Sequence, residues 1–187
     1  MSGTTISEQP VESVDDLVAF LRAGEKPPER WLVGTEHEKI GLHGADRSPV
    51  EYGGDCGIGV LLERIVDRAG WESILEDGKL IALQRDGASI TLEPGGQLEL
   101  SGAPLRTIFE TCAEFHAHLE LIRAVSEPLD IVWLSLGIHP IHSVDELPRM
   151  PKERYRIMRR YLPTRGSRGL IMMFATATVQ ANFDYAS

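Results

Sequence analysis

Two short segments of the sequence place polar pairs at the spacing of a β-strand. Glu36 and Glu38 lie two residues apart in "GTEHEK", and Gln97 and Glu99 have the same spacing in "GQLELS". Residues two apart on a strand point to the same face, so each pair is expected to share a face. Two carboxylates held this close repel, and burial would raise the pKa of at least one of them unless a cation lies between them. The alternative to a cation site is a strand face exposed to solvent.

The "LEPGGQ" segment adds a third element to this pattern. Glu93 lies just across the Pro94–Gly95–Gly96 turn from the second pair. Glycines allow the backbone to bend tightly and to approach a ligand closely. Carboxylate oxygens are hard ligands that suit Mg²⁺ or Mn²⁺. The acids of these strands are therefore predicted to supply oxygens to a shared metal site.

A third polar row lies near the end of the chain, where apolar and polar residues alternate strictly. This alternation predicts a strand with an apolar core face and a polar face that lines a cavity or faces solvent. The apolar row is Ala175, Ala177, Val179, Ala181 and Phe183, and the polar row is Thr176, Thr178, Gln180, Asn182 and Asp184.

Basic residues gather between Arg149 and Arg168. In a chain with a net charge of −9, such a cluster indicates a site for phosphate or carboxylate, or else a solvated helix. The cluster comprises Arg149, Lys152, Arg154, Arg156, Arg159, Arg160, Arg165 and Arg168.

The elements that must position these side chains follow from hydrophobic spacing and from turn residues. Helices are predicted from Ser13 to Gly24, around Val60 to Val66 with an end at Gly70, after Pro104, and between Pro151 and Pro163. The third helix carries an apolar stripe on which Cys112 is expected to be a small core residue. Strands are predicted at 31–42, in "KLIALQ" and "ASITLE" around a turn at 85–87, in "GQLELS", in "DIVWLSLGI" as a buried strand, and at 175–184. Hairpins mixed with long helices indicate an α+β fold, an antiparallel sheet with helices on one side.

Composition restricts the class of protein. The chain of 187 residues suits a single domain, 1–187, in which residues 1–12 are expected to form a flexible leader. The acidic net charge disfavours nucleic acid and anionic membranes as partners. The N-terminus has no basic, apolar signal segment, and the two cysteines fit a reducing compartment, so a cytoplasmic location is predicted.

Five segments together resemble the glutamate–cysteine ligase family, in its plant and proteobacterial branch. They are "GTEHEKIG", "ITLEPGGQLELSGAPL", "TCAEFHAHL", "MPKERYRIMRRYLP" and "MMFATATVQANFDY", and the resemblance extends from about Val14 to the last residue. It implies a curved antiparallel sheet like that of glutamine synthetase, with helices on its outer face. It also implies ATP-dependent joining of the γ-carboxylate of glutamate to cysteine through a γ-glutamyl phosphate, the first step of glutathione synthesis.

The resemblance also implies roles for individual residues. Glu36, Glu38, Glu93 and Glu99 match the acids expected to hold Mg²⁺ or Mn²⁺. Lys152, Arg154 and Tyr155 match a "PKxRY" motif expected to act on anionic groups of glutamate or ATP, with Lys152 and Arg154 as catalytic residues. Gln97, Gln180 and Asn182, with Tyr155, are expected to contact substrate. Cys112 matches a cysteine linked to redox control in plant forms, whereas Ala177 stands where those forms have a second cysteine.

Family members are more than twice as long as this chain, so the resemblance implies an incomplete sheet. The chain is expected to be an N-terminal portion that is inactive alone. The partners implied are glutamate, cysteine and ATP, and a homodimer is possible. Two alternatives stay open: a carboxylate–amine ligase with a different amine, and a non-catalytic relative that binds metal or nucleotide.

Overall fold

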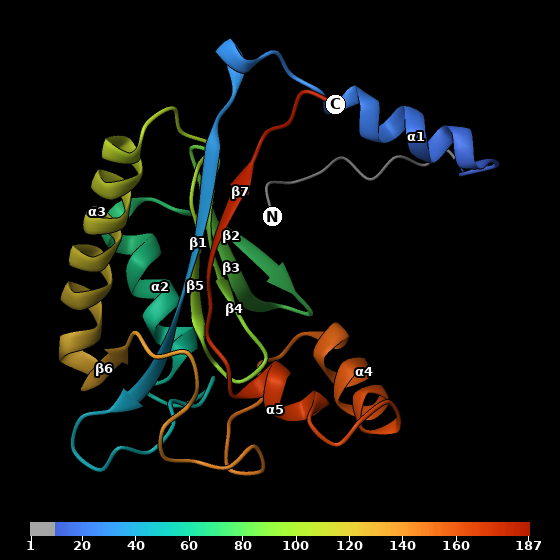
Figure 1. Ribbon diagram of the computed structural model, residues 1–187. Helices are drawn as coiled ribbons and strands as arrows, with labels where there is room; N and C mark the ends of the chain where they lie inside the picture. The colour runs from blue at the N-terminus through green and yellow to red at the C-terminus, as the bar shows by residue number, and fades with distance from the viewer. Residues whose placement is uncertain (1–9) are drawn as a thin grey trace.

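One long strand, β1 (Val33–His43), has partners along both of its edges. The computed structural model describes residues 10–187, and in this part of the chain it has a seven-stranded sheet whose pairs are all antiparallel (Figure 1). The strand order is β2-β3-β4-β5-β1-β6, and β7 also pairs with β1. The other strands are β2 (Glu72–Glu76), β3 (Lys79–Arg85), β4 (Ala88–Leu92), β5 (Leu98–Ser101), β6 (Ile131–Leu134) and β7 (Val179–Phe183).

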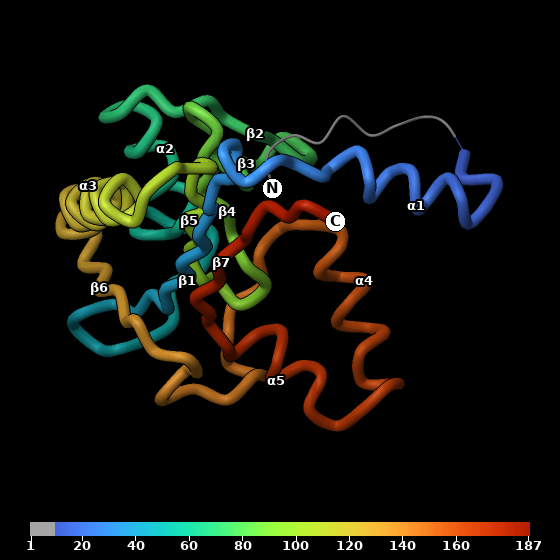
Figure 2. The backbone as a smooth tube through the Cα atoms, turned by 45° about the horizontal axis from the view of Figure 1, so that its top comes forward, coloured from blue at the N-terminus to red at the C-terminus, as the bar shows by residue number. Residues whose placement is uncertain are grey.

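The helices divide between the two sides of the sheet. α2 (Ile58–Ala69) and α3 (Ile108–Ser126) cover one face, and we call this the helical face. α4 (Glu153–Tyr161) and α5 (Gly169–Phe174) lie at one end of the other face, and α1 (Val14–Ala23) projects away from the sheet (Figures 1 and 2). The face that lacks α2 and α3 is called the open face below. The α+β prediction is therefore confirmed.

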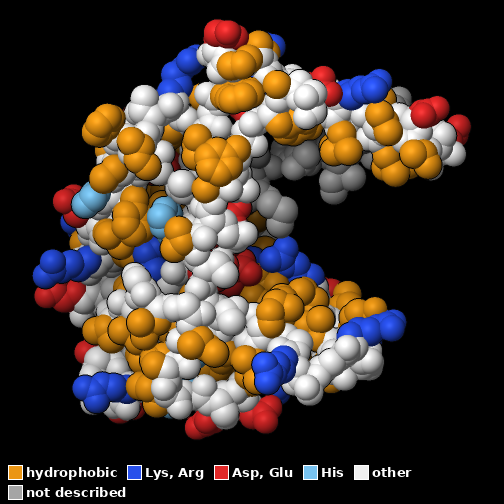
Figure 3. Space-filling model, in the orientation of Figure 1, with side chains coloured by type: hydrophobic (Ala, Val, Ile, Leu, Met, Phe, Trp, Pro, Cys, Tyr) orange, Lys and Arg blue, Asp and Glu red, His pale blue; other side chains and the backbone are white. Residues whose placement is uncertain are grey.

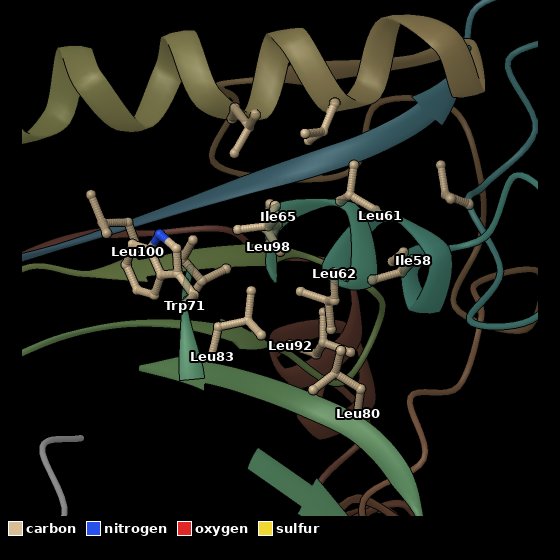
Figure 4. Close-up of a cluster of buried hydrophobic side chains, with 14 of the residues drawn as sticks. Ile58, Leu61, Leu62, Ile65, Trp71, Leu80, Leu83, Leu92, Leu98 and Leu100 are labelled. Atoms are coloured by element: carbon tan, nitrogen blue, oxygen red, sulfur yellow. The ribbon is translucent and has the colours of Figure 1, made fainter. Parts of the chain in front are cut away.

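The core lies between α2, α3 and the helical face. Alternate residues of β4 and β5 and one face of α2 are fully buried there, as strand and helix periodicity require. Each such side chain stabilises the fold by about 1.5–3 kcal/mol through removal from water. Figure 4 shows Ile58, Leu61, Leu62, Ile65, Trp71, Leu80, Leu83, Leu92, Leu98 and Leu100 converging on this region.

Local signals set the helix ends as predicted. Ser13 caps α1 and forms a capping box with Asp16, because each side chain accepts a hydrogen bond from the backbone N–H of the other residue. Gly70 ends α2 in the left-handed conformation, with φ of 66°. α1 nevertheless buries none of its residues, and its apolar side chains Val14, Leu17, Phe20 and Leu21 are each more than half exposed.

Cys112 is exposed, and the prediction that it lies in the core is wrong. Within the predicted stripe of α3, Ile122 is buried but Ile108 is 73% exposed, and Thr111 and His118 beside the stripe are buried instead. Three of the five buried residues of the helix are therefore polar. An apolar stripe cannot reveal such a rotation.

Two strand predictions also need correction. β2 is a strand that the sequence patterns did not predict. Asp77 and Gly78 form the turn between β2 and β3, and this Asp-Gly pair was the signal for a hairpin there. The predicted buried strand "DIVWLSLGI" is only β6, and Val132 in it is 45% exposed, because β6 pairs with the far end of β1 at the margin of the sheet.

The strand predicted at 175–184 is shorter and packs differently. Residues 169–174 form α5, and the strand begins at Val179. Ala175 and Ala177 are buried as predicted, but Val179 and Phe183 are 74% and 72% exposed, because the helices of the helical face do not extend over β7. The apolar row of β7 is therefore not part of the core.

The predicted leader, residues 1–12, lies mostly outside the described residues, and residues 10–12 have no regular structure. No described helix combines the length and the apolar character that a membrane span requires.

Candidate active site

The open face carries the predicted acids in neighbouring rows. Glu38 of β1 lies opposite Glu99 of β5, and in the next row Glu36 lies opposite Ser101. Directly opposed residues share a face, so both strands contribute to one surface. His37 points the other way and stacks on Phe115 of α3, with ring centres 4.3 Å apart. The sheet register therefore places the acids of β1 and β5 side by side on one face, and the spacing within each strand had predicted only that shared face.

Glu93 and Glu99 form the most buried part of this surface. Burial and the neighbouring carboxylate of Glu99 raise the pKa of Glu93 to about 7, although Lys152 and Arg154 oppose the shift. Glu99 is 9% exposed, and its oxygens accept hydrogen bonds from the hydroxyls of Thr91 and Ser101. Burial is the main cause of this shift and repulsion from Glu99 adds to it, so a cation beside the pair would favour the ionised forms.

Side chains and backbone of the last strand segment hold the two acids of β1. Glu38 accepts hydrogen bonds from the backbone N–H and the hydroxyl of Thr178, at 3.0 and 3.1 Å. Burial, followed by the charges of Glu99 and Glu36, raises its pKa against these bonds. Glu36 accepts from the amides of Gln180 and Asn182, at 2.8 and 3.0 Å. Gln180 and Asn182 thus lie on the open face, where they orient a carboxylate.

The "PKxRY" residues meet the acids at the other end of the surface. The Lys152 ammonium donates to the Leu92 carbonyl at 2.7 Å, and the Tyr155 hydroxyl donates to the same oxygen at 2.6 Å. Arg154 donates to the Tyr155 oxygen at 3.0 Å and lies 3.8 Å from the Glu93 carboxylate. Burial lowers the pKa of Lys152, and the charge of Glu93 opposes this. Two cations therefore adjoin the Glu93 carboxyl group, with Tyr155 buried between them and the strand.

The Pro-Gly-Gly turn has a structural explanation. A Cβ atom on Gly95 would lie 2.1 Å from the Phe174 carbonyl oxygen, so only glycine fits there. Gln97 is 3% exposed; its amide oxygen accepts from the Gly95 N–H at 2.8 Å, and its amide nitrogen donates to the Thr176 carbonyl at 2.6 Å. The turn and Gln97 thereby fix the segment that leads into β7. The amide of Gln97 is used in these bonds, and its predicted contact with substrate stays a prediction.

Two hollows lie at opposite ends of the acidic surface. The larger, about 620 Å³, is lined by Lys152, Tyr155 and Phe174 and by a set of charged residues: Asp77, Lys79, Arg149, Glu153, Arg156, Arg159 and Arg160. The smaller, about 260 Å³, lies beside Glu36. Figure 3 shows the molecule hollowed between α1 and the α4–α5 segment, with acidic and basic side chains meeting at its wall.

Among the four glutamates, Glu99 neighbours both Glu38 and Glu93, and Glu36 lies in the next row of the sheet. Within residues 10–187, no three His, Cys, Asp or Glu side chains are close enough together to hold one ion. Mg²⁺ commonly binds through one or two carboxylates and keeps several waters, so paired carboxylates fit it. The raised pKa values of Glu38 and Glu93 agree with this chemistry, because a cation would stabilise the ionised forms.

Sequence reasoning missed a polar cluster beneath the acids. Lys39 is 2% exposed on the helical face, where its ammonium donates to the His37 carbonyl at 3.1 Å and lies 5.4 Å from the centre of the Phe115 ring. Burial lowers its pKa to about 8. His118 is buried beside it, and burial lowers its pKa to about 3. Side chains alternate along β1, so Lys39 lies on the face of the sheet that Glu38 does not share. This alternation was the signal in the sequence that Lys39 faces the helices.

Comparison with protein families adds the decisive observation: residues 32–187 match the model of glutamate–cysteine ligase family 2 (GCS2). This chain belongs to that family. It is 47% identical over 173 residues to the chloroplastic glutamate–cysteine ligase A of rice. The aligned segment covers 92% of this chain and 35% of the rice protein. The chloroplastic glutamate–cysteine ligases of tobacco and Arabidopsis thaliana are 47% and 45% identical, with 33% of each covered. The chain thus spans about a third of the length of these family members.

These relatives contradict the predicted cytoplasmic location, because their names place them in the chloroplast. The prediction rested partly on two free cysteines, which suit any reducing compartment and do not distinguish one from another.

Proposed function

We propose that this chain forms part of the active site of an ATP-dependent glutamate–cysteine ligase. In this reaction the γ-carboxylate of glutamate attacks the γ-phosphorus of ATP, and ADP leaves. The amine of cysteine then attacks the acyl carbon of γ-glutamyl phosphate, inorganic phosphate leaves, and the nitrogen loses a proton. The observation that carries the proposal is the row of paired carboxylates with Lys152 and Arg154 at one end, in a chain of this family.

The carboxylates are proposed to bind Mg²⁺ or Mn²⁺. Glu93, Glu99 and Glu38 supply hard oxygens, and Glu36 is oriented for the same task by two amides. A bound divalent cation neutralises phosphate charge and so lets a carboxylate approach a triphosphate. The hydroxyls of Thr91, Ser101 and Thr178 hold the carboxylates in place and take no part in the reaction.

Lys152 and Arg154 are proposed to bind the phosphates of ATP. Lys152 lines the 620 Å³ hollow and also reaches the strand that ends at the acids, so it connects nucleotide and carboxylates. Arg154 is half-exposed and close to Glu93, where its planar guanidinium can pair with a phosphate. Tyr155 is a positioning residue, since its hydroxyl links Arg154 to the Leu92 carbonyl.

Calorimetry with Mg-ATP tests this proposal. We expect Lys152→Met to weaken binding by at least about tenfold, the effect of one lost charge-assisted contact. Lys26→Met is the matched control. The Lys26 ammonium lies 2.7 Å from the Asp184 carboxylate and lines the small hollow, which does not include the "PKxRY" residues. Equal affinity in both variants and the unchanged chain would contradict the proposal. Measuring ADP release with glutamate and a series of amines then tests the acceptor.

A further inference from the structure

A third hollow lies on the helical face, between α3 and the sheet. Its volume is about 310 Å³, at the lower end of the range of roughly 300–1,000 Å³ typical of ligand pockets. Leu100 of β5 lies in its wall, and alternation along that strand places Leu100 on the face opposite to Glu99. The sheet therefore separates this hollow from the candidate active site.

Two buried side chains of the wall have nitrogen atoms without partners. Trp71 is 6% exposed and His118 is 5% exposed, and within residues 10–187 neither the Trp71 Nε1 atom nor either ring nitrogen of His118 makes a hydrogen bond. The Trp71 nitrogen lies on the α3 side of its ring (Figure 4), and His118 belongs to α3. Buried polar groups are nearly always satisfied, so two such groups in one wall indicate a polar partner that the described part of the chain does not supply.

These nitrogens and a neighbouring arginine are mainly hydrogen-bond donors. An indole N–H can only donate, whereas a neutral imidazole donates through one nitrogen and accepts through the other. Burial, with the charges of Lys39 and His37, lowers the pKa of His118 to about 3, so its ring is neutral. The Arg85 guanidinium lies 4.7 Å from the centre of the Trp71 ring and adds a positive charge to the wall. The wall therefore suits an anionic group with acceptor oxygens.

The acids of the wall limit the charge of such a group. Glu114 accepts a hydrogen bond from the backbone N–H of Ala103 at 2.9 Å, and its charge is balanced by that of Arg85. Asp86 is exposed, so solvent screens its charge. This balance accepts a single negative charge and disfavours a phosphate dianion.

The rest of the wall is apolar. It consists of leucine and alanine side chains from the sheet, from the segment after β5 and from α3. A ligand that fills the hollow must therefore present an apolar body as well as an acceptor group. A small aliphatic acid combines the two. Glutamate does not, because its ammonium and its second carboxylate would be buried against leucine and alanine.

We propose that this hollow binds a small aliphatic monocarboxylate, whose oxygens accept hydrogen bonds from Trp71, His118 and Arg85. The unpaired nitrogens are buried, so the ligand reaches them only when a side chain of the wall shifts. Arg85 is the side chain suited to this, because it is partly exposed and donates to the Ala69 carbonyl through one nitrogen, at 2.9 Å. The inference does not depend on the proposed function, since the sheet lies between the two sites.

The indole N–H resonance of Trp71 reports directly on this contact. Hexanoate is titrated into the ¹⁵N-labelled chain, and the resonance is assigned by its loss in Trp71→Phe. We expect it to move downfield and to saturate below about 10 mM hexanoate. Trp31 and Trp133 are internal controls, because their indole N–H groups already donate to the Lys26 carbonyl at 2.8 Å and to the Ser126 hydroxyl at 2.7 Å.

A leucine at Ala117 tests the location by blocking the hollow. Ala117 is an exposed residue of the wall, so we expect Ala117→Leu to weaken hexanoate binding at least about tenfold. Ala113→Leu is the matched control, because it makes the same exchange at an exposed position one turn earlier on α3, outside the wall. The affinity for Mg-ATP should be the same in both variants.

Three other solutes test the ligand class. Hexanamide keeps the apolar body without the charge, acetate keeps the charge with little apolar body, and inorganic phosphate carries more charge. We expect each to bind at least about tenfold more weakly than hexanoate.

Four results would overturn the proposal. A Trp71 resonance that does not move at about 10 mM hexanoate would show that the hollow holds water only. Equal affinities for hexanoate and hexanamide would remove the carboxylate, and tighter binding of phosphate would replace the ligand class. Equal hexanoate affinities in Ala117→Leu and Ala113→Leu would place the ligand elsewhere.

Discussion

Replacing Glu93 by glutamine should stabilise the chain in the absence of divalent cations, and more so at high pH. The pKa of Glu93 rises from 4.5 to about 7 on folding, because its side chain is 18% exposed and lies beside Glu99. The folded chain therefore binds this proton more tightly than the unfolded chain. Well below pH 4.5 Glu93 does not affect the free energy of unfolding. As the pH rises Glu93 lowers this free energy, and its destabilising effect reaches its full size above about pH 7.

The size of the effect follows from the shift. Each tenfold change in proton affinity corresponds to about 1.4 kcal/mol. The raised pKa of Glu93 therefore lowers the free energy of unfolding by about 3 kcal/mol at pH 8 and by about 1 kcal/mol at pH 5. Glutamine keeps the shape and carries no charge. The variant should accordingly unfold with a free energy about 3 kcal/mol higher than the unchanged chain at pH 8, and about 1 kcal/mol higher at pH 5.

Urea unfolding in EDTA at several pH values measures this difference directly. Glu72→Gln is the matched control, because Glu72 is exposed on β2 and far from the acids in the sheet order. Adding Mg²⁺ at pH 8 should then raise the stability of the unchanged chain more than that of Glu93→Gln, since only the former keeps the carboxylate. Parallel pH profiles for the unchanged chain and Glu93→Gln between pH 5 and 8 would refute the reasoning.

Three further changes test other parts of the structure. Gly95→Ala should lower the free energy of unfolding by about 2 kcal/mol or more in urea titrations, because its methyl group would collide with the Phe174 carbonyl; a smaller loss would show that this contact is loose. Glu99→Gln should weaken Mg²⁺ binding at least about tenfold in calorimetry while the far-ultraviolet circular dichroism stays the same; unchanged affinity removes Glu99 from the ligands. Replacing exposed Val179 and Phe183 by threonine and serine should reduce self-association in sedimentation velocity, and an unchanged distribution would contradict a sticky β7 surface.

Much of the fold could be predicted because local patterns determine it. Ser13 and Gly70 set helix ends through hydrogen bonds and backbone conformation that depend on a few neighbouring residues. The alternation of β1 and β5 placed the acids on one face in the same way. The apolar row of β7 was misassigned because alternation shows which residues share a face and cannot show whether another element covers that face.

The face that carries the acids was predictable from the sequence, and the assembly of the candidate site was not. Acid spacing indicated carboxylates on a shared surface, but the partners of Glu36 come from amides about 145 residues away in the chain. Lys39 and His118 were missed because a polar residue on a buried face needs tertiary contacts to explain it. Such contacts depend on strand order, which periodicity does not contain.

The antiparallel pairing of β7 with β1 has a consequence for the order in which the chain folds. Bonds that fix Glu36 and Glu38 span 140 to 146 residues, whereas α2, β3, β4 and β5 form a core from neighbouring segments. Contacts between distant segments carry a larger loop-closure entropy and form late. A nascent chain that has folded its core through β5 would therefore hold Glu36 and Glu38 without these hydrogen bonds until β7 leaves the ribosome. The proposed metal site would then be assembled only once β7 has paired with β1.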